Sequence, residues 1–439
     1  MFRRKRQTIA LLAACTVFLT FSLAGCGSQS NQSSSQGSQK EQITFVNWAS
    51  AEESSRPFIN QVIDDFQKQN PNITVKSVPI AISDIANQLT TMTTGGSAPD
   101  VAQININEGV TLANMGILTQ TDNLVPQEYA SDPTFKKSWD LGAVNGKHYG
   151  MPWTPQPQGF YYNKTLMQQA GLDPNKPPKT WDEFMKDLDI ARQKLPKEDL
   201  IIGLDTTVRT IGLDQQWAII RGFGANPVDG TKVQANTPEM TNYATWLRKM
   251  VSGGYTLPGK KFGEFRPIAA QHHLLFMIDE PQFKGILQSL DKNLTDDAFY
   301  KEWGVSAIPA GIDGKTYSAP DDHHLVLFKD SKHQEAAMKF AEFLINSEQA
   351  SKGYNAKIGV LPATKIGFDK YQDVFGDPVR KTFINDVEPN VVSLPVGPNL
   401  PKISTEIMTG MQQVITTNDP IPTILNNMQT KLEGIVNGK

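Results

Sequence analysis

The fold is decided by residues 41–106, which read EQITFVNWASAEESSRPFINQVIDDFQKQNPNITVKSVPIAISDIANQLTTMTTGGSAPDVAQINI. Residues 43–48 are rich in apolar and β-favouring side chains, which predicts a strand. The apolar residues between Phe58 and Phe66 fall on one helical face, and Asn70-Pro71 predicts the end of that helix. A second strand, a second helical stripe and a third strand follow by residue 106. This β-α-β-α-β order predicts a parallel sheet wrapped by helices.

Further helices are predicted along the rest of the chain. Thr180–Glu183 and Ser331–Gln334 have the pattern of capping boxes, and each precedes an apolar stripe at helical spacing. Two more amphipathic helices are predicted near the C-terminus, over residues 403–415 and 421–435. The alternation of strands and helices indicates an α/β protein.

The N-terminus has the layout of an export signal. Four basic residues, 3–6, precede an apolar run from Ile9 to Leu23, which is short for a membrane span. The run ends in Leu23-Ala24-Gly25-Cys26, which resembles the lipobox of bacterial lipoproteins. That resemblance implies a signal peptide over residues 1–25 and a diacylated Cys26 as the first mature residue. The alternative is an ordinary secretory signal followed by a chance cysteine.

Composition narrows the class of the mature chain. Removal of residues 1–25 leaves 38 basic against 45 acidic residues, a net charge of about −7, which gives no electrostatic basis for nucleic-acid binding. The only other cysteine, Cys15, lies in the signal, so disulfides and thiolate chemistry are not expected. Residues 26–41 are expected to be the lipidated cysteine and a flexible Ser/Gln/Gly-rich linker.

Several segments, in order along the chain, resemble the family 1 extracellular solute-binding proteins, the sugar-binding receptors of ABC importers. They cover nearly all of the mature chain, and an ordered set is more specific than any one segment. The segments are Thr94–Val101, Asn145–Pro152, Tyr161–Leu166, Ala170–Leu172, Pro178–Phe184, Met277–Pro281 and Gly359–Pro362.

The resemblance implies an α/β fold of the periplasmic-binding-protein type II, with a ligand cleft between two lobes joined by crossing strands. Lobe 1 is expected over residues 42–153 plus 308–355, and lobe 2 over residues 158–303 plus 359–439. The chain is expected to cross between the lobes near 153–160, 305–309 and 357–359.

A sugar presents hydroxyls and apolar faces, so its receptor needs planar hydrogen-bonding side chains and aromatic platforms. In open α/β sheets such groups lie past the carboxyl ends of strands. For Trp48 and Trp217 a place in the core is the alternative, and for the residues after the third strand it is a helix cap. The candidate ligand-binding residues are Trp48, Ser50, Glu52, Asn105, Asn107, Glu108, Trp153, Gln156, Trp217, Asp279, Glu280, Gln282, Asp322 and His323.

One departure from the family bears on the ligand. Glu280-Pro281-Gln282 stands where the family commonly has Gly-Pro-Trp, and Ile407 matches the position of a second aromatic residue. Loss of two stacking platforms favours a small or unusually polar ligand over a long oligosaccharide. A metal site at Asp321-Asp322-His323-His324 is not expected, because neighbours on a strand point to opposite faces and two ligands do not make a site.

The sequence therefore predicts a lipid-anchored receptor on the outer face of the bacterial cell membrane. It would bind a mono- or short oligosaccharide and deliver it to separate ABC permease subunits, as a monomer without a cofactor or metal. A non-sugar polar solute such as a polyamine or a phosphate ester is the first alternative. A surface-anchored glycoside-active enzyme is the second, because paired carboxylates can lie far apart in a chain.

Overall fold

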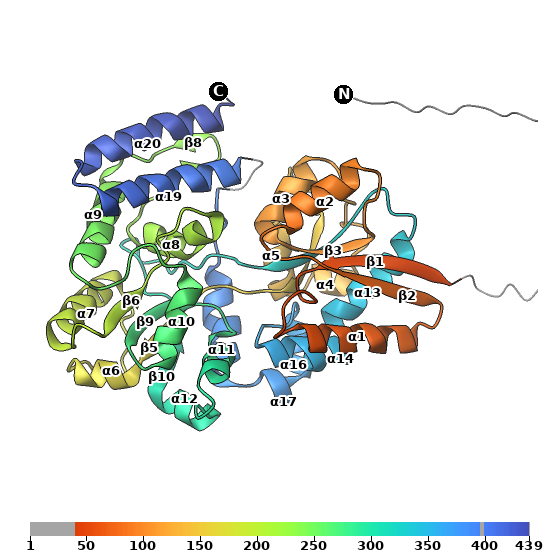
Figure 1. Cartoon of the computed structure of the whole chain (residues 1–439), viewed down its shortest axis with the longest axis horizontal. Coiled ribbons are helices and arrows are strands. Elements are labelled where there is room, and N and C mark those ends of the chain that lie inside the picture. The colour runs from red at the N-terminus through yellow and green to blue at the C-terminus, as the bar shows by residue number, and fades with distance from the viewer. Residues whose placement is uncertain (1–39, 396–398, 439) are drawn as a thin grey trace, which may run out of the picture. The chain divides into compact units, whose positions relative to one another are not determined.

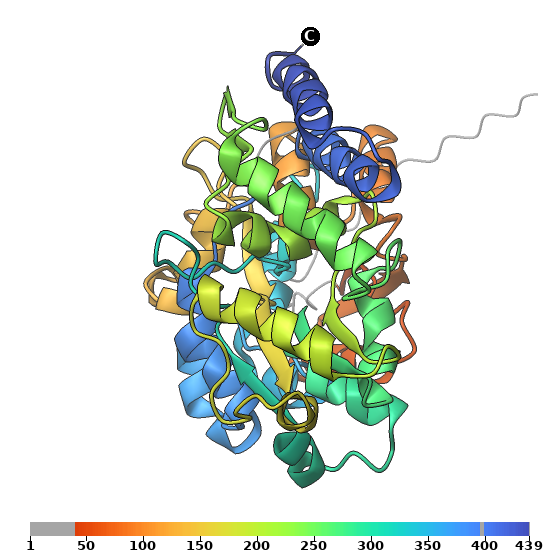
Figure 2. The same cartoon turned by 90° about the vertical axis from the view of Figure 1, so that its left-hand side faces the viewer.

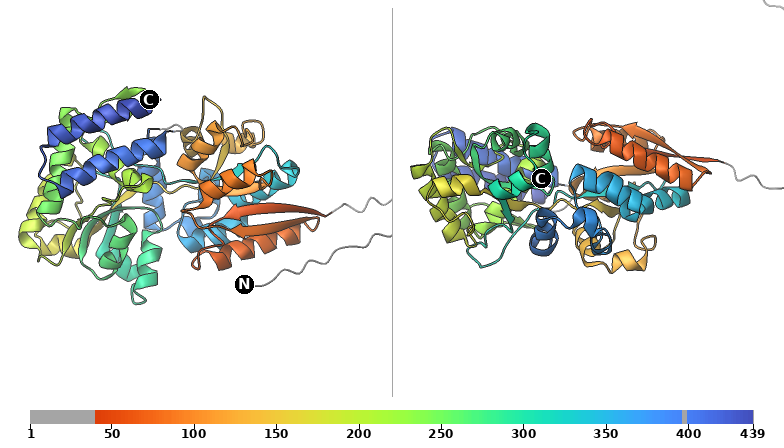
Figure 3. Two further views of the ribbon diagram at one scale, coloured as in Figure 1. Left: turned by 45° about the horizontal axis from the view of Figure 1, so that its top comes forward. Right: turned by 90° about the horizontal axis from the view of Figure 1, so that it is seen from below.

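The computed structural model describes residues 40–395 and 399–438 (Figure 1). Residues from Lys40 onwards belong to one compact unit, built around two separate sheets. The export signal, Cys26 and most of the expected linker lie outside the described residues, so those predictions stay predictions. Figure 3 shows the two sheet-centred lobes and the thin connections between them.

The lobe 1 sheet has the strand order β2-β1-β3-β11-β4. Its first three strands are parallel, as the β-α-β-α-β pattern predicts, whereas β11 is antiparallel to both of its neighbours. The prediction of a parallel sheet holds for these three strands and is wrong for β11, which runs against the other four strands and makes the sheet mixed. The strands are β1 (Glu41–Asn47), β2 (Ile73–Pro79), β3 (Val101–Asn105), β4 (Gly150–Thr154) and β11 (His323–Leu327).

Both faces of the lobe 1 sheet are covered by helices. Successive strand residues point to opposite faces, so Phe45 joins one apolar cluster and Val46 the other. The first face packs on helices α1 (Arg56–Gln69), α5 (Pro133–Leu141) and α13 (Gln334–Asn346), and the second on α2 (Ile85–Thr94) and α3 (Ile106–Asn114). The central strand β3 is buried at every residue, whereas the edge strand β2 is only partly buried and carries Lys76 and Ser77.

The lobe 2 sheet has the strand order β10-β5-β9-β6 and is also covered on both faces. Its strands are β5 (Gly159–Asn163), β6 (Leu200–Gly203), β9 (Leu274–Asp279) and β10 (Trp303–Ser306). One face packs on the long helices that Figure 2 shows from the side: α7 (Trp181–Lys194), α8 (Thr210–Gly222), α9 (Pro238–Ser252), α19 (Leu400–Thr416) and α20 (Ile421–Val436). The other face packs on α10 (Arg266–Ala270), α11 (Phe283–Leu290), α12 (Asp296–Glu302) and residues from Leu361 to Val387.

The two predicted capping boxes have different outcomes. At α7 the Thr180 hydroxyl accepts from the Glu183 amide at 3.3 Å, and the Glu183 carboxylate accepts from the Thr180 amide at 3.1 Å. The second prediction is wrong, because His333 is the residue that precedes α13. The Ser331 hydroxyl instead accepts from the His333 amide and donates to Asp100 Oδ1.

The chain crosses between the lobes at places that differ from the expected ones. Residues 155–158 connect β4 to β5, as expected. The expected crossing near 305–309 is wrong, because Ile308, Tyr317 and Ala319 are packed in the lobe 2 core. The chain returns to lobe 1 beside the bridge between Pro157 and Pro320.

The third boundary also shifts. Ala363 packs in the lobe 1 core, and the amides of Lys365 and Ile366 donate to the Asp132 carboxylate at the start of α5. The helix α16 (Lys365–Lys370) therefore contacts lobe 1, while its Phe368 packs in the lobe 2 cluster, so both lobes share the segment that follows the boundary predicted at residue 359. The shorter helices are α4 (Gln127–Ala130), α6 (Lys164–Gln169), α14 (Glu348–Ala350), α15 (Ala356–Ile358), α17 (Gln372–Phe375) and α18 (Pro378–Thr382).

Within residues 40–395 and 399–438, no helix has both the length and the apolar character that crossing a membrane requires.

Candidate ligand-binding site

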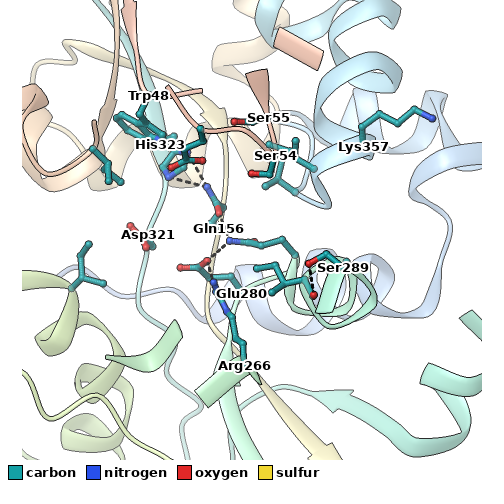
Figure 4. A pocket seen from close by; sticks show the side chains of 18 of the residues that line it. Trp48, Ser54, Ser55, Gln156, Arg266, Glu280, Ser289, Asp321, His323 and Lys357 are labelled. Carbon is teal, nitrogen blue, oxygen red and sulfur yellow. Dashed lines mark hydrogen bonds and ion pairs between the residues drawn. The ribbon is translucent and has the colours of Figure 1, made fainter. Parts of the chain in front are cut away.

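A cavity of about 550 Å³ lies where the two lobes meet the crossing segments (Figure 4). This volume lies in the range typical of small-molecule sites. The cavity is lined by side chains from both lobes and from the crossing segments. They are Trp48, Glu52, Ser54, Ser55, Ile82, Gln156, Arg209, Ile211, Phe262, Arg266, Glu280, Gln282, Gly285, Ile286, Ser289, Asp321, His323, Tyr354, Lys357, Ile358 and Val360.

The lobe 1 wall of the cavity includes Trp48, Glu52, His323 and Tyr354. Trp48 comes directly after β1 and His323 begins β11, so the sheet brings them together at its edge. Their rings meet edge to face with centroids 4.7 Å apart. Burial lowers the pKa of His323 to about 4, so the imidazole is neutral at pH 7. This wall therefore combines packed rings with polar groups, namely the carboxylate of Glu52 and the hydroxyls of Ser54 and Ser55.

Gln156, on the first crossing segment, connects the two walls. Its amide nitrogen lies 2.9 Å from His323 Nδ1, and its Oε1 accepts from Gln282 Nε2 at 2.7 Å. The segment is held from behind by Asp322, whose Oδ1 accepts from the Gln156 backbone amide at 2.9 Å and whose Oδ2 accepts from the Ser138 hydroxyl. A hydrogen-bonded chain thus runs from lobe 1 to lobe 2 across the cavity floor (Figure 4).

The polar side chains of the lobe 2 wall include Arg266, Glu280 and Gln282, and its apolar part includes Ile211, Phe262 and Ile286. The Arg266 guanidinium binds Asp279 in a bidentate pair, Nε to Oδ2 at 3.0 Å and Nη2 to Oδ1 at 2.7 Å. Its contact with Glu280 Oε2 is longer, at 3.4 Å. Asp279 is completely buried and therefore holds Arg266 in place, while Glu280 and Gln282 face the cavity.

Negative charge concentrates around Asp321, which lines the cavity beside Glu280 (Figure 4). Asp321 Oδ1 accepts from the Asn105 side-chain amide. Burial and then the charge of Asp321 raise the pKa of Glu280 well above its usual value, and the nearby Arg266 only partly offsets this. The same two causes raise the pKa of the buried Asp214 and bring that of Glu108 to about 7.

Two oxygen atoms on the lobe 2 wall are buried without a hydrogen-bond partner among the described residues. They are Glu280 Oε1 and Gln282 Oε1. Both belong to side chains that line the cavity, and Glu280 is only 3% exposed. A buried acceptor without a donor costs free energy, typically about 1–3 kcal/mol. The lobe 2 wall therefore presents two buried acceptors that the described residues leave unpaired.

Six of the fourteen residues that the sequence nominates lie on the cavity surface: Trp48, Glu52, Gln156, Glu280, Gln282 and His323. The other eight do not line it: Ser50, Asn105, Asn107, Glu108, Trp153, Trp217, Asp279 and Asp322. Several of these eight support the residues that do, as Asp279 and Asp322 illustrate. Ser50 belongs to the turn after β1, where its hydroxyl lies 2.8 Å from that of Ser77.

The expectation that Trp153 is a stacking platform is wrong. Its side chain is completely buried in the lobe 1 core, on the same face of β4 as Met151. Its indole Nε1 donates to the Leu344 carbonyl at 3.1 Å, and its ring stacks on Tyr354 at a centroid distance of 5.0 Å. Trp153 therefore supports the cavity-lining Tyr354 from behind.

Trp217 is likewise a core residue. It is 2% exposed, packs among the apolar residues of α8 and donates its Nε1 proton to the Ser393 carbonyl at 3.1 Å. Asn105 and Asn107 form the start of α3, where Asn105 Oδ1 accepts from the Asn107 amide at 2.9 Å. The helix-cap alternative thus describes Asn105 better than direct ligand contact does.

Several lining residues are absent from the sequence-based set. Arg209, Arg266, Asp321, Tyr354 and Lys357 all lie on the cavity surface. Asp321 directly precedes the candidates Asp322 and His323 and could have been included with them. The two arginines lie in no local sequence pattern that indicates a binding role. No group of three or more residues of the types that ligate metals lies together in the part of the chain described here.

A two-lobed α/β body with a polar cavity at the junction of its lobes defines the class of solute-binding receptors. The model of the family described as "Bacterial extracellular solute-binding protein" matches residues 50–351, and the chain belongs to this family. The resemblance and the fold class predicted from the sequence are thereby confirmed.

Individual relatives are more distant. The chain is 24% identical over 390 to 460 residues to two proteins of this kind. The maltodextrin-binding protein of Bacillus subtilis (strain 168) matches over 97% of this chain and 98% of its own length. The sn-glycerol-3-phosphate-binding periplasmic protein of Pectobacterium atrosepticum matches over 84% and 81%.

Among solved structures, an ABC transporter solute-binding protein from Thermotoga lettingae TMO, bound with α-D-tagatose, is similar with a TM-score of 0.74. It shares 21% sequence identity with the chain, and the similarity covers 90% of this chain and all of that one. At this identity the likeness establishes the fold.

Proposed function

We propose that this protein is the extracytoplasmic receptor of an ABC importer and binds a mono- or short oligosaccharide in the cavity between its lobes. The observation that carries the proposal is the pairing of an aromatic lobe 1 wall with a lobe 2 wall that has unpartnered buried acceptors. Sugars offer both an apolar C–H face and several hydroxyl donors, so they complement both walls. Maltodextrin and tagatose, in the names of similar proteins, are ligands of this chemistry.

A phosphate ester fits the cavity less well, although one relative is named for sn-glycerol-3-phosphate. The two lining arginines already have carboxylate partners, since Arg209 pairs with the buried Asp205 and Arg266 with the buried Asp279. A dianionic phosphate would also lie near Glu280 and Asp321. Among the described lining residues Lys357 is a further cation, but the three carboxylates of Glu52, Glu280 and Asp321 line the same cavity, and this arrangement of charge favours a neutral or cationic ligand.

Delivery, anchoring and lack of catalysis belong to the same proposal. The lipobox-like sequence supports a lipid on Cys26 that holds the receptor at the outer face of the membrane, where separate permease subunits would accept the ligand. The family consists of binding proteins, and this supports a receptor that returns its ligand unchanged. Cys26→Ser should release the protein from the membrane fraction or leave the signal uncleaved.

The proposal is tested by calorimetry and thermal shift with purified residues 40–439 against a panel of mono-, di- and trisaccharides. A ligand that binds only the folded state raises the apparent melting temperature, by an amount set by its concentration relative to Kd. We expect at least one sugar to bind and to be recovered intact. If sugars have no effect while phosphate esters bind, the carbohydrate assignment is wrong; if a sugar is cleaved, the receptor assignment is wrong.

A further inference from the structure

The lobe 2 wall has two buried acceptor atoms without a partner in the part of the chain that the structure describes, and one of them belongs to a carboxylate. The Glu280 carboxylate oxygen Oε1 has no hydrogen-bond partner among the described residues. Glu280 is only 3% exposed. The neighbouring Gln282 Oε1 is in the same situation. Both unpartnered groups are acceptors, so the ligand must supply donors at this place.

The charges around Glu280 do not balance. Arg266 is the cation nearest to Glu280, but its two short hydrogen bonds go to Asp279, and its contact with Glu280 is 3.4 Å long. Asp321 stands close enough to Glu280 for a hydrogen bond between the two carboxyl groups, which requires a shared proton, and it also accepts from the uncharged Asn105 amide. The fully buried Asp214 adds a further carboxyl behind Asp321.

Two carboxylates that face one cavity repel each other unless a proton or a cation lies between them. A neutral hydroxyl can donate one hydrogen bond but does not remove this repulsion. An ammonium group carries three donors and a positive charge. It can therefore serve Glu280 Oε1 and Asp321 together, with hydrogen bonds of the stronger, charge-assisted kind.

We propose that the carbohydrate bound by this receptor carries a protonated amine, as an amino sugar does, and that the amine sits between Glu280 and Asp321. The inference rests on the proposed function, since it names the class of sugar for the same cavity. The rest of the sugar contacts Gln156 and Gln282 and lies against the Trp48 side of the cavity. N-acetylation of the amine would remove the charge and weaken binding.

The test uses matched sugars that differ in one substituent. Glucosamine, galactosamine and mannosamine, together with the β-1,4-linked glucosamine disaccharide, are each compared with the form that has a hydroxyl at the same carbon and with the N-acetyl form. Spermidine and putrescine are included as amines without a sugar. Calorimetry at pH 7 should find an amino sugar that binds roughly tenfold or more tighter than both of its counterparts, a difference of about 1.4 kcal/mol.

Variants then locate the amine. Glu280→Gln and Asp321→Asn should each abolish the preference for the amine over the hydroxyl form. Both side chains keep their shape, and Asp279 still holds Arg266, so the variants should fold. Glu53→Gln is the matched control: it removes one carboxylate from an exposed residue outside the cavity and should keep the preference.

A second readout is proton exchange. Burial and Asp321 raise the pKa of Glu280, and an ammonium bound beside it would lower that pKa again and so favour release of a proton. Calorimetry in buffers of different ionisation enthalpy should show proton release on binding in the native protein and less release in Glu280→Gln. A merely structural role of Glu280 would leave proton release unchanged.

The outcomes separate this inference from the proposed function. If hydroxyl or N-acetyl sugars bind as tightly as amino sugars, or tighter, the amine inference is overturned and the carbohydrate receptor stands. If polyamines bind and every sugar is silent, the carbohydrate function is overturned. If no member of the panel binds, both are overturned.

Discussion

The two walls of the cavity differ in how many of their side chains find packing or hydrogen-bond partners within the protein. The lobe 1 wall is built from rings that contact one another: Trp48 meets His323, and Tyr354 stacks on Trp153 behind it. The lobe 2 wall instead keeps Glu280 and Gln282 with buried acceptors that find no partner among the described residues. The rings of lobe 1 thus pack on one another, whereas lobe 2 presents two buried acceptors that the described residues leave unpaired.

This difference suggests how damage to each wall should appear in experiments. Changes behind the lobe 1 wall remove packing and should lower the free energy of unfolding. Changes on the lobe 2 wall, or at the Gln156 connection, remove contacts that matter mainly with ligand present and should lower affinity. The variants below test that division, beginning with the largest expected effect.

Trp153→Ala should reduce the free energy of unfolding by about 3–5 kcal/mol, since it removes a completely buried indole and leaves a cavity. Urea denaturation measures this change. Ligand affinity of the folded fraction should change little, because Tyr354 stands between Trp153 and the cavity. A large loss of affinity with unchanged stability would mean that Trp153 faces the ligand after all. Trp153→Phe, which keeps a ring, is the milder companion variant.

Glu108→Gln should change how stability depends on pH. Burial and the charge of Asp321 raise the pKa of Glu108 to about 7 from its ordinary value of 4.5. The folded protein therefore binds a proton more tightly than the unfolded chain, and this stability is lost as pH rises from 4.5 to about 7. The glutamine variant lacks this loss.

Relative to the native protein, Glu108→Gln should therefore gain up to about 3 kcal/mol of stability between pH 4.5 and pH 8, because each unit of pKa shift corresponds to about 1.4 kcal/mol. The neutral, buried His323 and His324 destabilise the native protein and the variant equally at acid pH, so they cancel in the difference. Urea denaturation across this pH range gives the value. A pH-independent difference would contradict the assignment.

Gln156→Ala should weaken ligand binding roughly tenfold or more, because an unpaired hydrogen-bonding group costs about 1–3 kcal/mol. The substitution breaks the link from His323 to Gln282, and the melting temperature of the ligand-free protein should hardly move. Gln168→Ala, at an exposed position of α6, is the matched control and should bind normally. Equal effects of the two variants would remove Gln156 from the site.

Trp48→Leu should have the smallest effect on affinity, about fivefold, since aromatic contacts contribute about 0.5–1.5 kcal/mol beyond area burial. Trp48 is only 3% exposed, so a ligand touches its edge more than its face. Trp48→Phe should recover most of the affinity. If both variants bind as the native protein does, the lobe 1 wall contributes shape alone.

Much of the fold could be predicted from the sequence because local patterns are strong. The strands and helices of residues 41–106 follow apolar periodicity, and Thr180 with Glu183 forms the expected capping box. The insertion of the antiparallel strand β11 between β3 and β4 could not be predicted in this way, since these strands lie far apart in the chain. The second lobe boundary was predicted wrongly for a similar reason, because residues 308–319 have no local sequence pattern that assigns them to lobe 2.

The site was predictable only where residues directly follow strands. Trp48 and Glu280 come immediately after β1 and β9, and both line the cavity. Trp153 was misplaced because it lies within β4, where the alternation with Met151 directs it to the core. Arg266 was missed because its role depends on Asp279, a partner that only the folded structure brings into contact with it.

The most direct test of the account is a crystal structure of residues 40–439 with the tightest-binding sugar of the panel. We expect the sugar in the cavity between the lobes, with a donor of the ligand hydrogen-bonded to Glu280 Oε1 and a sugar face or edge against Trp48. A sugar bound elsewhere on the molecule, or one in the cavity that leaves Glu280 Oε1 without a donor, would contradict the account.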